Sequence, residues 1–188
     1  MINEAIFKQF PVLESDRLLF REFELGDAKN ILAIRSNMDV MAYMDTTIIR
    51  TIVAAEGFVN GSGLAHTNKT GICWAIIDKT TNQFIGDFSY HKLDRKNHRG
   101  EIGYTLKPEC WGKGYMRETM ETLFKFGFEE LNIHSIEANI NPKNGNSRNI
   151  LLKMGFLKEA YFKESYFFKG QYLDSEIYSL LAEWQTEN

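Results

Sequence analysis

The chain contains Thr105-Leu-Lys-Pro-Glu-Cys-Trp-Gly-Lys-Gly-Tyr-Met-Arg117, which leads from a strand-like run, through a break at Pro108, into two glycines and an amphipathic helix. Gly112 and Gly114 have no Cβ, so the backbone there can take φ values that other residues avoid. Consecutive amide hydrogens can then converge on a phosphate, and the helix adds its unpaired first-turn N–H groups and positive dipole end. We therefore predict an anion-binding turn at the start of this helix.

Two nucleotide-binding signatures can be compared with this turn. A dinucleotide fingerprint needs a third glycine where Arg117 stands, and a P-loop needs Lys followed by Ser or Thr. Neither pattern is present in the segment. The remaining alternative is an ordinary strand-to-helix turn in which the glycines only relieve steric crowding.

The segment after the turn has helical periodicity. Its apolar side chains and one glycine recur at three- and four-residue spacing: Met116, Met120, Leu123, Phe124, Gly127, Phe128 and Leu131. Charged residues occupy the opposite side. This pattern predicts a helix over residues 115–131 that packs one face on a sheet.

Length and composition favour one domain over residues 1–188. The chain is 44% hydrophobic and 13% aromatic, enough for one well-buried core, and its net charge of −3 is too small to indicate a nucleic-acid partner. Cys73 and Cys110 lie far apart, and no His pair has metal-ligand spacing, so we expect free thiols and no metal site. The N-terminus has no long apolar run, so we expect neither a signal peptide nor a membrane span, and a cytoplasmic protein.

The N-terminal part combines one strand with helical patterns. A strand is expected over residues 17–23, and Asp27 is the expected N-cap of the helix that follows. A second helix is expected near residues 50–60. Residues 61–70, which include two glycines, are the most loop-like segment and are expected to border a substrate entrance.

The middle of the chain is rich in strands. Strand-like runs at residues 71–78, 83–93 and 98–106 are joined by short polar turns, which predicts an antiparallel meander. After the helix over residues 115–131, a strand is expected over residues 135–140. A strand–helix–strand connection of this length predicts that the flanking strands pair in parallel, with a right-handed crossover.

The C-terminal part begins with the polar segment Asn141-Pro-Lys-Asn-Gly-Asn-Ser147, which follows a strand and leads into a helix over residues 145–154 capped by Gly155. Two further strand-like runs close a mixed α/β sheet. Polar side chains at the ends of parallel strands often bind ligands. An anion would be favoured, because residues 141–158 hold four basic side chains and no acidic one: Lys143, Arg148, Lys153 and Lys158. The alternative is a helix capped by Asn144 or Ser147 with a solvated basic face.

Together, residues 108–116 and the pattern Asn141-x-x-Asn144-x-x-Ser147 with Gly155-Phe156 resemble the GNAT superfamily of acetyl-CoA-dependent N-acetyltransferases. The segments 13–23, 84–88 and 101–104 are similar to the ribosomal-protein alanine N-acetyltransferase (RimJ/RimL) branch. The resemblance covers nearly the whole chain and is strongest over residues 83–156.

The resemblance implies an α/β (α+β) fold. Its sheet would be mixed, mostly antiparallel, six- to seven-stranded, flanked by helices and splayed between strands 4 and 5. The pantetheine arm of acetyl-CoA would lie in that gap against the backbone of Thr105, Leu106 and Lys107. The pyrophosphate would be held by backbone amides of Trp111, Gly112, Lys113, Gly114, Tyr115 and Met116. Further coenzyme contacts would come from Asn141, Asn144, Ser147 and Arg148.

Acetyl transfer needs a neutral amine, a polarised carbonyl and a leaving thiolate. Glu101 is the candidate base, because on an alternating strand it shares a face with Gly103 and Thr105 and the family often places a base there that acts through water. The alternative is a solvated or ion-paired carboxylate. A backbone N–H near Leu106 is expected to donate a hydrogen bond to the oxyanion. One such donor lowers the barrier by roughly 3 kcal/mol. The resemblance assigns Ser147 to the coenzyme sulfur.

Tyr166 stands where related enzymes of this branch can carry a glutamate. It is expected either to donate a proton or to line an acceptor pocket. The aromatic run around it is interpreted as strand core: Tyr161, Phe162, Tyr166, Phe167, Phe168 and Tyr172. The four histidines, at 66, 91, 98 and 134, show no partner pattern and receive no catalytic role.

The resemblance implies an N-acetyltransferase that uses acetyl-CoA as cosubstrate by direct transfer in a ternary complex. The favoured acceptor is a protein N-terminal α-amine, such as that of a ribosomal protein. A reference α-amine with pKa near 7.8 is about a tenth neutral at pH 7, so it needs less help from a base than a lysine does. The alternatives are a small amine, such as a polyamine, an amino acid or an aminoglycoside, and a CoA-binding regulatory module without turnover. A monomer and a homodimer both remain open.

Overall fold

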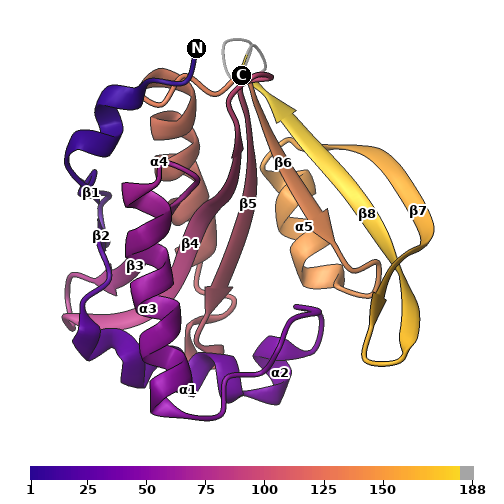
Figure 1. Cartoon of the computed structure of the whole chain (residues 1–188), viewed down its shortest axis with the longest axis horizontal. Coiled ribbons are helices and arrows are strands. Elements are labelled where there is room, and N and C mark those ends of the chain that lie inside the picture. The colour runs from indigo at the N-terminus through magenta and orange to yellow at the C-terminus, as the bar shows by residue number, and fades with distance from the viewer. Residues whose placement is uncertain (183–188) are drawn as a thin grey trace.

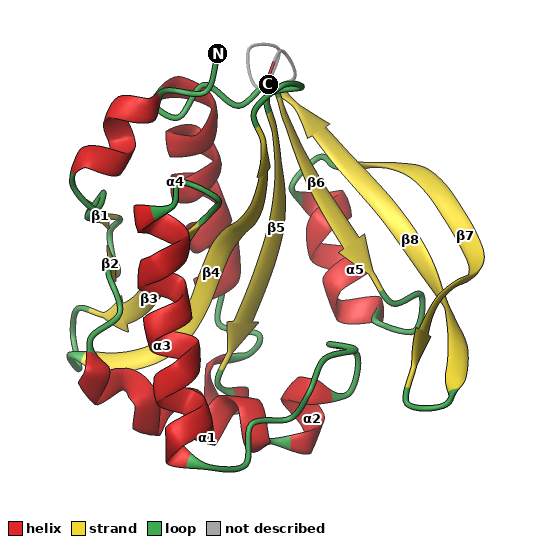
Figure 2. Cartoon of the chain, viewed as in Figure 1, coloured by secondary structure: helices red, strands yellow, loops and turns green. Residues whose placement is uncertain are grey.

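In the computed structural model, which describes residues 1–182, one eight-stranded sheet carries helices on both faces (Figures 1 and 2). The strands are β1 (Leu13–Glu14), β2 (Leu18–Arg21), β3 (Ile72–Asp78), β4 (Gln83–Asp94), β5 (Arg99–Leu106), β6 (Ser135–Ile140), β7 (Leu157–Phe168) and β8 (Gln171–Leu181). The α-helices are α1 (Ala28–Ser36), α2 (Met38–Met41), α3 (Ile52–Thr67), α4 (Tyr115–Glu129) and α5 (Gly145–Lys153). Three 3₁₀ turns, η1 (Glu4–Lys8), η2 (Leu25–Asp27) and η3 (Pro108–Cys110), complete these elements.

The strand order is β1-β2-β3-β4-β5-β6-β8-β7, and every described pair is antiparallel except β5 with β6. This confirms the predicted meander of β3, β4 and β5 and the predicted parallel pair. The sheet has one strand more than the upper expected number, because the chain forms the two-residue strand β1 before β2.

The parallel pair of β5 and β6 is short. Its register contains only Arg99 with Ser135, Gly100 with Ile136, and Glu101 with Glu137. Beyond these residues the two strands diverge, as Figure 1 shows. This is the predicted splay, which falls between the fifth and sixth strands here because β1 shifts the count by one.

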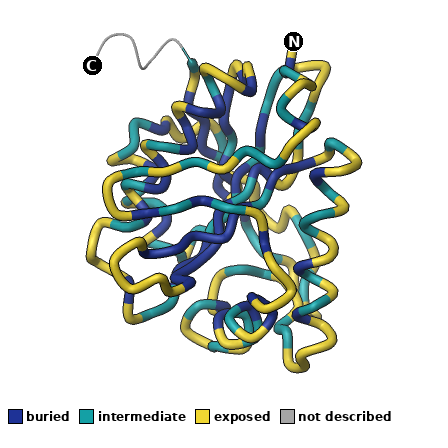
Figure 3. Tube along the Cα trace, turned by 90° about the vertical axis from the view of Figure 1, so that its left-hand side faces the viewer, coloured by how far each residue is buried: buried dark blue, intermediate teal, exposed yellow. Residues whose placement is uncertain are grey.

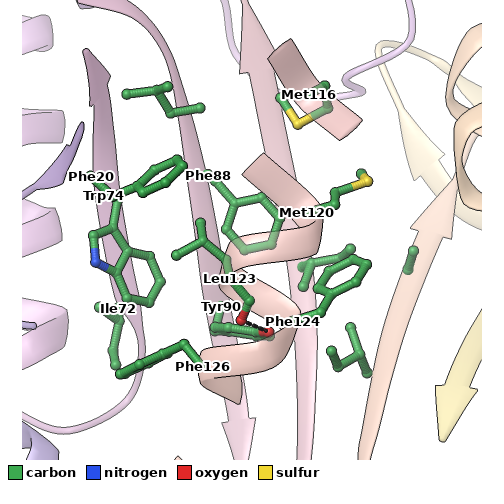
Figure 4. Packing of buried hydrophobic residues seen from close by; sticks show 14 of the residues in the cluster. Phe20, Ile72, Trp74, Phe88, Tyr90, Met116, Met120, Leu123, Phe124 and Phe126 are labelled. Atoms are coloured by element: carbon green, nitrogen blue, oxygen red, sulfur yellow. Dashed lines mark hydrogen bonds between the residues drawn. The ribbon is translucent and has the colours of Figure 1, made fainter. Parts of the chain in front are cut away.

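Helix α4 packs on one face of the sheet through its apolar stripe. Met120, Leu123 and Phe124 are fully buried against Phe88 and Tyr90 of β4 (Figure 4). The Tyr90 hydroxyl donates a hydrogen bond of 2.9 Å to the Leu123 carbonyl oxygen. These contacts confirm the predicted amphipathic helix and fix its N-terminus beside the end of β5.

Helices α1 and α3 cover the opposite face. Ile31, Ile34, Ala55 and Val59 form a second buried cluster, which also contains Ala75 and two other strand residues. Side chains alternate along β3, so Ala75 lies in this cluster while its neighbours Trp74 and Ile76 lie in the first. Buried residues gather along the central strands between the two layers (Figure 3). None of the helices within residues 1–182 is long and apolar enough to cross a lipid bilayer.

One local prediction in the N-terminal part was wrong, and another was confirmed only in position. The glycine-containing segment after residue 60 is not a loop, because α3 continues to Thr67. Each glycine costs a helix about 1 kcal/mol relative to alanine, and packing of α3 against α1 and β3 outweighs this cost. Asp27 does stand at the predicted N-cap position of α1, but its carboxylate makes no capping bond to α1 and instead accepts hydrogen bonds from the Glu24 N–H and the Arg21 guanidinium.

The interpretation of the C-terminal aromatic run as strand core was also wrong. Tyr161, Phe162, Phe167 and Tyr172 are each at least half exposed. They lie on the hairpin of β7 and β8, and β7 is the edge strand of the sheet. Tyr161 and Phe162 are consecutive and so point to opposite faces of β7, yet both are exposed, which shows that neither face is covered there.

Candidate active site

The turn before α4 has the predicted backbone. Gly112 and Gly114 have φ values of 72° and 82°, in the left-handed region, and Gly114 is the N-cap residue of α4. A Cβ at Gly112 would meet no atom within 4 Å, and one at Gly114 would approach only Arg17 Nη2, at 3.5 Å. Glycine is therefore needed here for the shape of the backbone, and the space beside the turn is open.

A clamp from the segment between β1 and β2 holds this turn. Arg17 Nη1 donates to the Lys113 carbonyl oxygen at 3.1 Å, and Arg17 Nε lies 2.6 Å from Glu118 Oε2 in the first turn of α4. Ser15 Oγ also donates to Glu118, at 2.7 Å. Burial raises the pKa of Glu118, but the hydrogen bonds from Arg17 and Ser15 outweigh it and lower that pKa overall. The negative charge of Glu118 is thus paired with Arg17, so it repels an anion at the N-terminus of α4 less strongly than an unpaired carboxylate would.

A groove of about 810 Å³ extends from this turn along the end of β5 to α5. Nine of the predicted coenzyme-binding residues line it: Thr105, Leu106, Trp111, Gly112, Gly114, Tyr115, Met116, Asn144 and Ser147. Residues of α4 and α5 that are far apart in sequence therefore face one space, which is large enough for an extended ligand.

The other four predicted coenzyme residues do not line the groove. The Lys107 ammonium donates to Asn30 Oδ1 at 3.0 Å, and Arg148 Nε donates to Glu176 Oε2 at 3.0 Å. Lys113 contributes its carbonyl oxygen to the clamp on the turn. Asn141 lines a separate, smaller cavity between β5 and β6.

One edge of β5 is open where the strands diverge. The Lys107 N–H donates to the Ile85 carbonyl oxygen at 2.8 Å, so the odd-numbered residues at this end of β5 direct their backbone groups to β4. Tyr104 and Leu106 therefore direct their N–H groups to the other edge, where β6 no longer pairs. The Leu106 carbonyl oxygen accepts a bond of 3.0 Å from Trp111 Nε1. This leaves the Leu106 N–H directed into the divergence of the two strands.

A second cavity, of about 320 Å³, lies between β5 and β6. Glu101 and Gly103 of β5, His91 of β4 and Asp45 from the segment after α2 are among its lining residues. His91 Nε2 lies 3.4 Å from Glu101 Oε1, and the Lys92 ammonium lies 3.7 Å from Glu101 Oε2. Hydrogen bonding by His91 lowers the pKa of Glu101, against the opposing effect of burial, and the positive charges nearby add to the lowering.

The groove and the second cavity share a wall. The residues that line both are Tyr43, Met44, Tyr104, Asn144 and Ser147. Ser147 Oγ and Tyr104 Oη lie 2.6 Å apart, and the Ser147 N–H donates to the N-cap side chain of Asn144 at 3.0 Å. Burial raises the pKa of Tyr104 to about 12, so its hydroxyl keeps its proton at neutral pH. A pair of hydroxyl groups therefore stands at the junction of the two spaces.

Tyr166 lines the second cavity and not the groove. Its hydroxyl donates to Asp45 Oδ2 at 2.5 Å, and Asn141 Nδ2 donates to the same oxygen at 3.0 Å. Burial and the neighbouring Asp45 raise the pKa of Tyr166. These bonds join β7, the segment after α2 and the end of β6 across one side of the cavity.

Sequence reasoning missed three members of this site. His91 had no recognisable partner pattern, because the register that sets β4 against β5 cannot be read from the sequence. Tyr104 lay within a segment that carried the resemblance, but nothing indicated its contact with Ser147. The segment that contributes Tyr43 and Asp45 had no motif, and the segment after residue 60, expected at an entrance, lines neither space.

Comparisons with known proteins agree with this geometry. The sequence model of the acetyltransferase (GNAT) domain matches residues 17–157. The uncharacterized N-acetyltransferase YoaA of Bacillus subtilis is 34% identical, over 92% of this chain and 97% of its own length. The crystal structure of a GNAT-family acetyltransferase from Bacillus anthracis superimposes with a TM-score of 0.82 at 29% identity, covering 92% of this chain and 99% of that one.

Relatives with named acceptors fall into two kinds. The [ribosomal protein uS5]-alanine N-acetyltransferase of Escherichia coli is 28% identical over 63% of this chain and 62% of its own length. The spermidine N-acetyltransferase of Vibrio cholerae, solved with CoA and spermine, has the same fold, with a TM-score of 0.79 at 21% identity over 90% of this chain and 98% of that one.

Proposed function

The chain belongs to the GNAT family of acetyltransferases and is an acetyl-CoA-dependent N-acetyltransferase, and we propose that its acceptor is the α-amine of a protein N-terminus. The observation that carries the proposal is the shared wall. A long groove that starts at the turn with two left-handed glycines and a smaller cavity meet at Tyr104 and Ser147, as direct transfer between two bound substrates requires.

The groove is proposed as the coenzyme site. The amides of residues 111–116 would hold the diphosphate, because the two left-handed glycines leave that backbone uncovered and α4 presents its N-terminus there. The open edge of β5 at Tyr104, where β6 no longer pairs, offers backbone groups to the amides of the pantetheine arm. Acetyl-CoA supplies the thioester, and the chain supplies the groups that orient and polarise it.

Two groups near the junction are proposed to stabilise charge that develops during transfer. The Leu106 N–H is directed where the strands part, so it is available to an oxyanion, and one such donor contributes roughly 3 kcal/mol. The Ser147 hydroxyl is assigned to the leaving thiolate, supported by its place on the shared wall beside Tyr104. Tyr166 is assigned to the acceptor, since it lines only the second cavity.

The second cavity is proposed to take the amine. Glu101 is the carboxylate beside it, and its lowered pKa makes it a weaker base than an unperturbed glutamate. A weak base suffices for an α-amine, which is about a tenth neutral at pH 7, but a lysine-like amine with pKa near 10.4 is neutral in only about four molecules in ten thousand. The chemistry of this cavity therefore favours an α-amine, the kind of acceptor that the uS5-alanine enzyme is named for.

A small polyamine is the second candidate. It is favoured by the presence of two carboxylates, Asp45 and Glu101, in one cavity of about 320 Å³. Two negative groups suit an acceptor that carries a second ammonium group, as spermidine does. Its reacting amine, however, would need more help in losing its proton.

Release of the CoA thiol from acetyl-CoA, measured with different amine acceptors, tests the proposal. The purified chain is incubated with acetyl-CoA and either an alanine-initiated peptide, the same peptide with a blocked N-terminus and one lysine, or spermidine. We expect the highest kcat/KM with the free α-amine and none with the blocked peptide. Release that is fastest with spermidine would replace the proposed acceptor with the polyamine.

A further inference from the structure

The second cavity contains an imidazole that the chemistry above leaves without a role. His91 lines this cavity, and its side chain is 47% exposed. It lies at a bulge of β4, where Tyr90 pairs with Ile102 but Lys92 pairs with Glu101. Two residues of β4, His91 and Lys92, therefore oppose the single residue Glu101, and both side chains reach its carboxylate.

The two ring nitrogens of His91 have different surroundings. Nε2 lies 3.4 Å from Glu101 Oε1. Nδ1 faces Gly103, where a Cβ would come within 3.3 Å of it. The missing side chain at Gly103 therefore leaves space for the ring, and Gly103 itself lines the cavity.

We propose that His91 accepts the proton of the acceptor ammonium at Nδ1, and that Glu101 orients the ring and stabilises the imidazolium through Nε2. The inference rests on the proposed function, since it requires the amine to occupy this cavity. Glu101 then acts through His91, as a positioning residue. Histidine is the side chain that most often serves as a general acid or base, and the Glu101 carboxylate beside Nε2 supplies the counter-charge.

The step is a single proton transfer. One N–H bond of the ammonium group breaks, its electron pair stays on the amine nitrogen, and the proton binds Nδ1. The neutral amine is then free to attack the acetyl carbonyl carbon. Because nearly half of the ring is exposed, the proton can pass to water before the next turnover.

The charged groups around the ring are consistent with this role. Glu101 is the carboxylate nearest to the ring, and the Lys92 ammonium balances part of its charge at 3.7 Å. Asp45 lines the same cavity, with its carboxylate bound by Tyr166 and Asn141. The lowered pKa of Glu101 makes it a poor proton acceptor but a suitable counter-charge for an imidazolium.

Rates of thiol release measured across pH test the role of His91. The enzymes are the wild type, His91→Gln and His134→Gln, a control at an exposed histidine outside both the groove and the cavity. The acceptors are the alanine-initiated peptide and spermidine. We expect His91→Gln to lower kcat/KM by about 100-fold, the lower end for general base catalysis, at pH values below the pKa of the acceptor amine. The control should keep the wild-type rate at each pH.

A second readout needs no turnover. The Glu101 carboxyl carbon is followed by ¹³C NMR during an acid titration, with its resonance identified by its loss in Glu101→Gln. In His91→Gln the pKa of Glu101 should rise toward its ordinary value of 4.5. An unchanged pKa would show that the pair does not form in solution and would overturn the inference.

The outcomes separate the two proposals. If the wild type turns over an amine and His91→Gln has a rate within about threefold of the control at each pH, the inference fails and the proposed function stands. If the wild type acetylates none of the amines, the proposed function fails and the inference fails with it.

Discussion

Replacing Gly114 with alanine should weaken acetyl-CoA binding by more than its effect on folding explains. Gly114 has a φ of 82° and lines the groove at the N-terminus of α4. An alanine in the left-handed region costs about 1–2 kcal/mol. This corresponds to a fall in melting temperature of about 2–8 °C for a chain of this size.

The loss of binding has a separate cause. The new methyl group would stand beside the amides proposed to hold the diphosphate, and it would displace a phosphate oxygen from at least one of them. A hydrogen bond to a charged group contributes about 1.5–3 kcal/mol, so the dissociation constant should rise about 10- to 150-fold. Isothermal titration calorimetry with acetyl-CoA measures this change, and thermal unfolding measures the stability.

Gly170→Ala is the matched control. Gly170 has a φ of 85°, and a Cβ there would meet no atom within 4 Å, but it lies in the turn between β7 and β8 and does not line the groove. It should lose similar stability and keep the wild-type affinity. If both variants bind acetyl-CoA equally well, the turn does not grip the diphosphate and the reasoning is refuted.

Three further predictions concern the junction, the core and the clamp. In steady-state kinetics, Ser147→Ala should lower kcat about tenfold and keep KM for acetyl-CoA within about threefold of the wild type, because the Ser147 hydroxyl is assigned to the thiolate that forms during transfer. A change in KM alone would contradict this assignment. Asp87→Asn should lower the free energy of unfolding, measured in urea, by about 3 kcal/mol, because it breaks a buried ion pair with Arg35. The control Glu121→Gln, at an exposed ion pair on α4, should cost under about 0.5 kcal/mol. Equal losses in the two variants would refute this prediction. Glu118 has a pKa below its ordinary value of 4.5, so its stabilisation is present above that pH and is lost as pH falls through the folded-state value. The stability gap between wild type and Glu118→Gln should therefore narrow in urea titrations from about pH 6 to about pH 3, and a constant gap would be inconsistent with this.

The parts of the fold that were predicted correctly depend on local rules. Gly112 and Gly114 were recognised because a left-handed turn before a helix has few other solutions, and α4 was recognised because its apolar residues repeat at helical spacing. The parallel pairing of β5 with β6 followed from the length of the connection. Each of these inferences needs only residues that are close in sequence.

The errors arose where distant contacts decide the outcome. Local propensity placed a loop at the glycines after residue 60, but packing against α1 and β3 keeps them helical. The aromatic rings of β7 and β8 look like core residues until the sheet order places β7 at the edge.

The site shows the same limit. Glu101 and Ser147 were predicted from strand alternation and the family resemblance, but their partners were not, because each partner comes from a different element. His91 meets Glu101 through a bulge between β4 and β5, and Tyr104 of β5 meets Ser147 of α5 where β5 diverges from β6. Side-chain pairing of this kind depends on register, which no local pattern encodes.

A crystal structure of the chain with bound CoA is the most direct test of the coenzyme site. We expect diphosphate oxygens about 3 Å from backbone nitrogens within residues 111–116, and the sulfur at the wall formed by Tyr104 and Ser147. A diphosphate bound away from that turn, or a sulfur remote from that wall, would contradict the account.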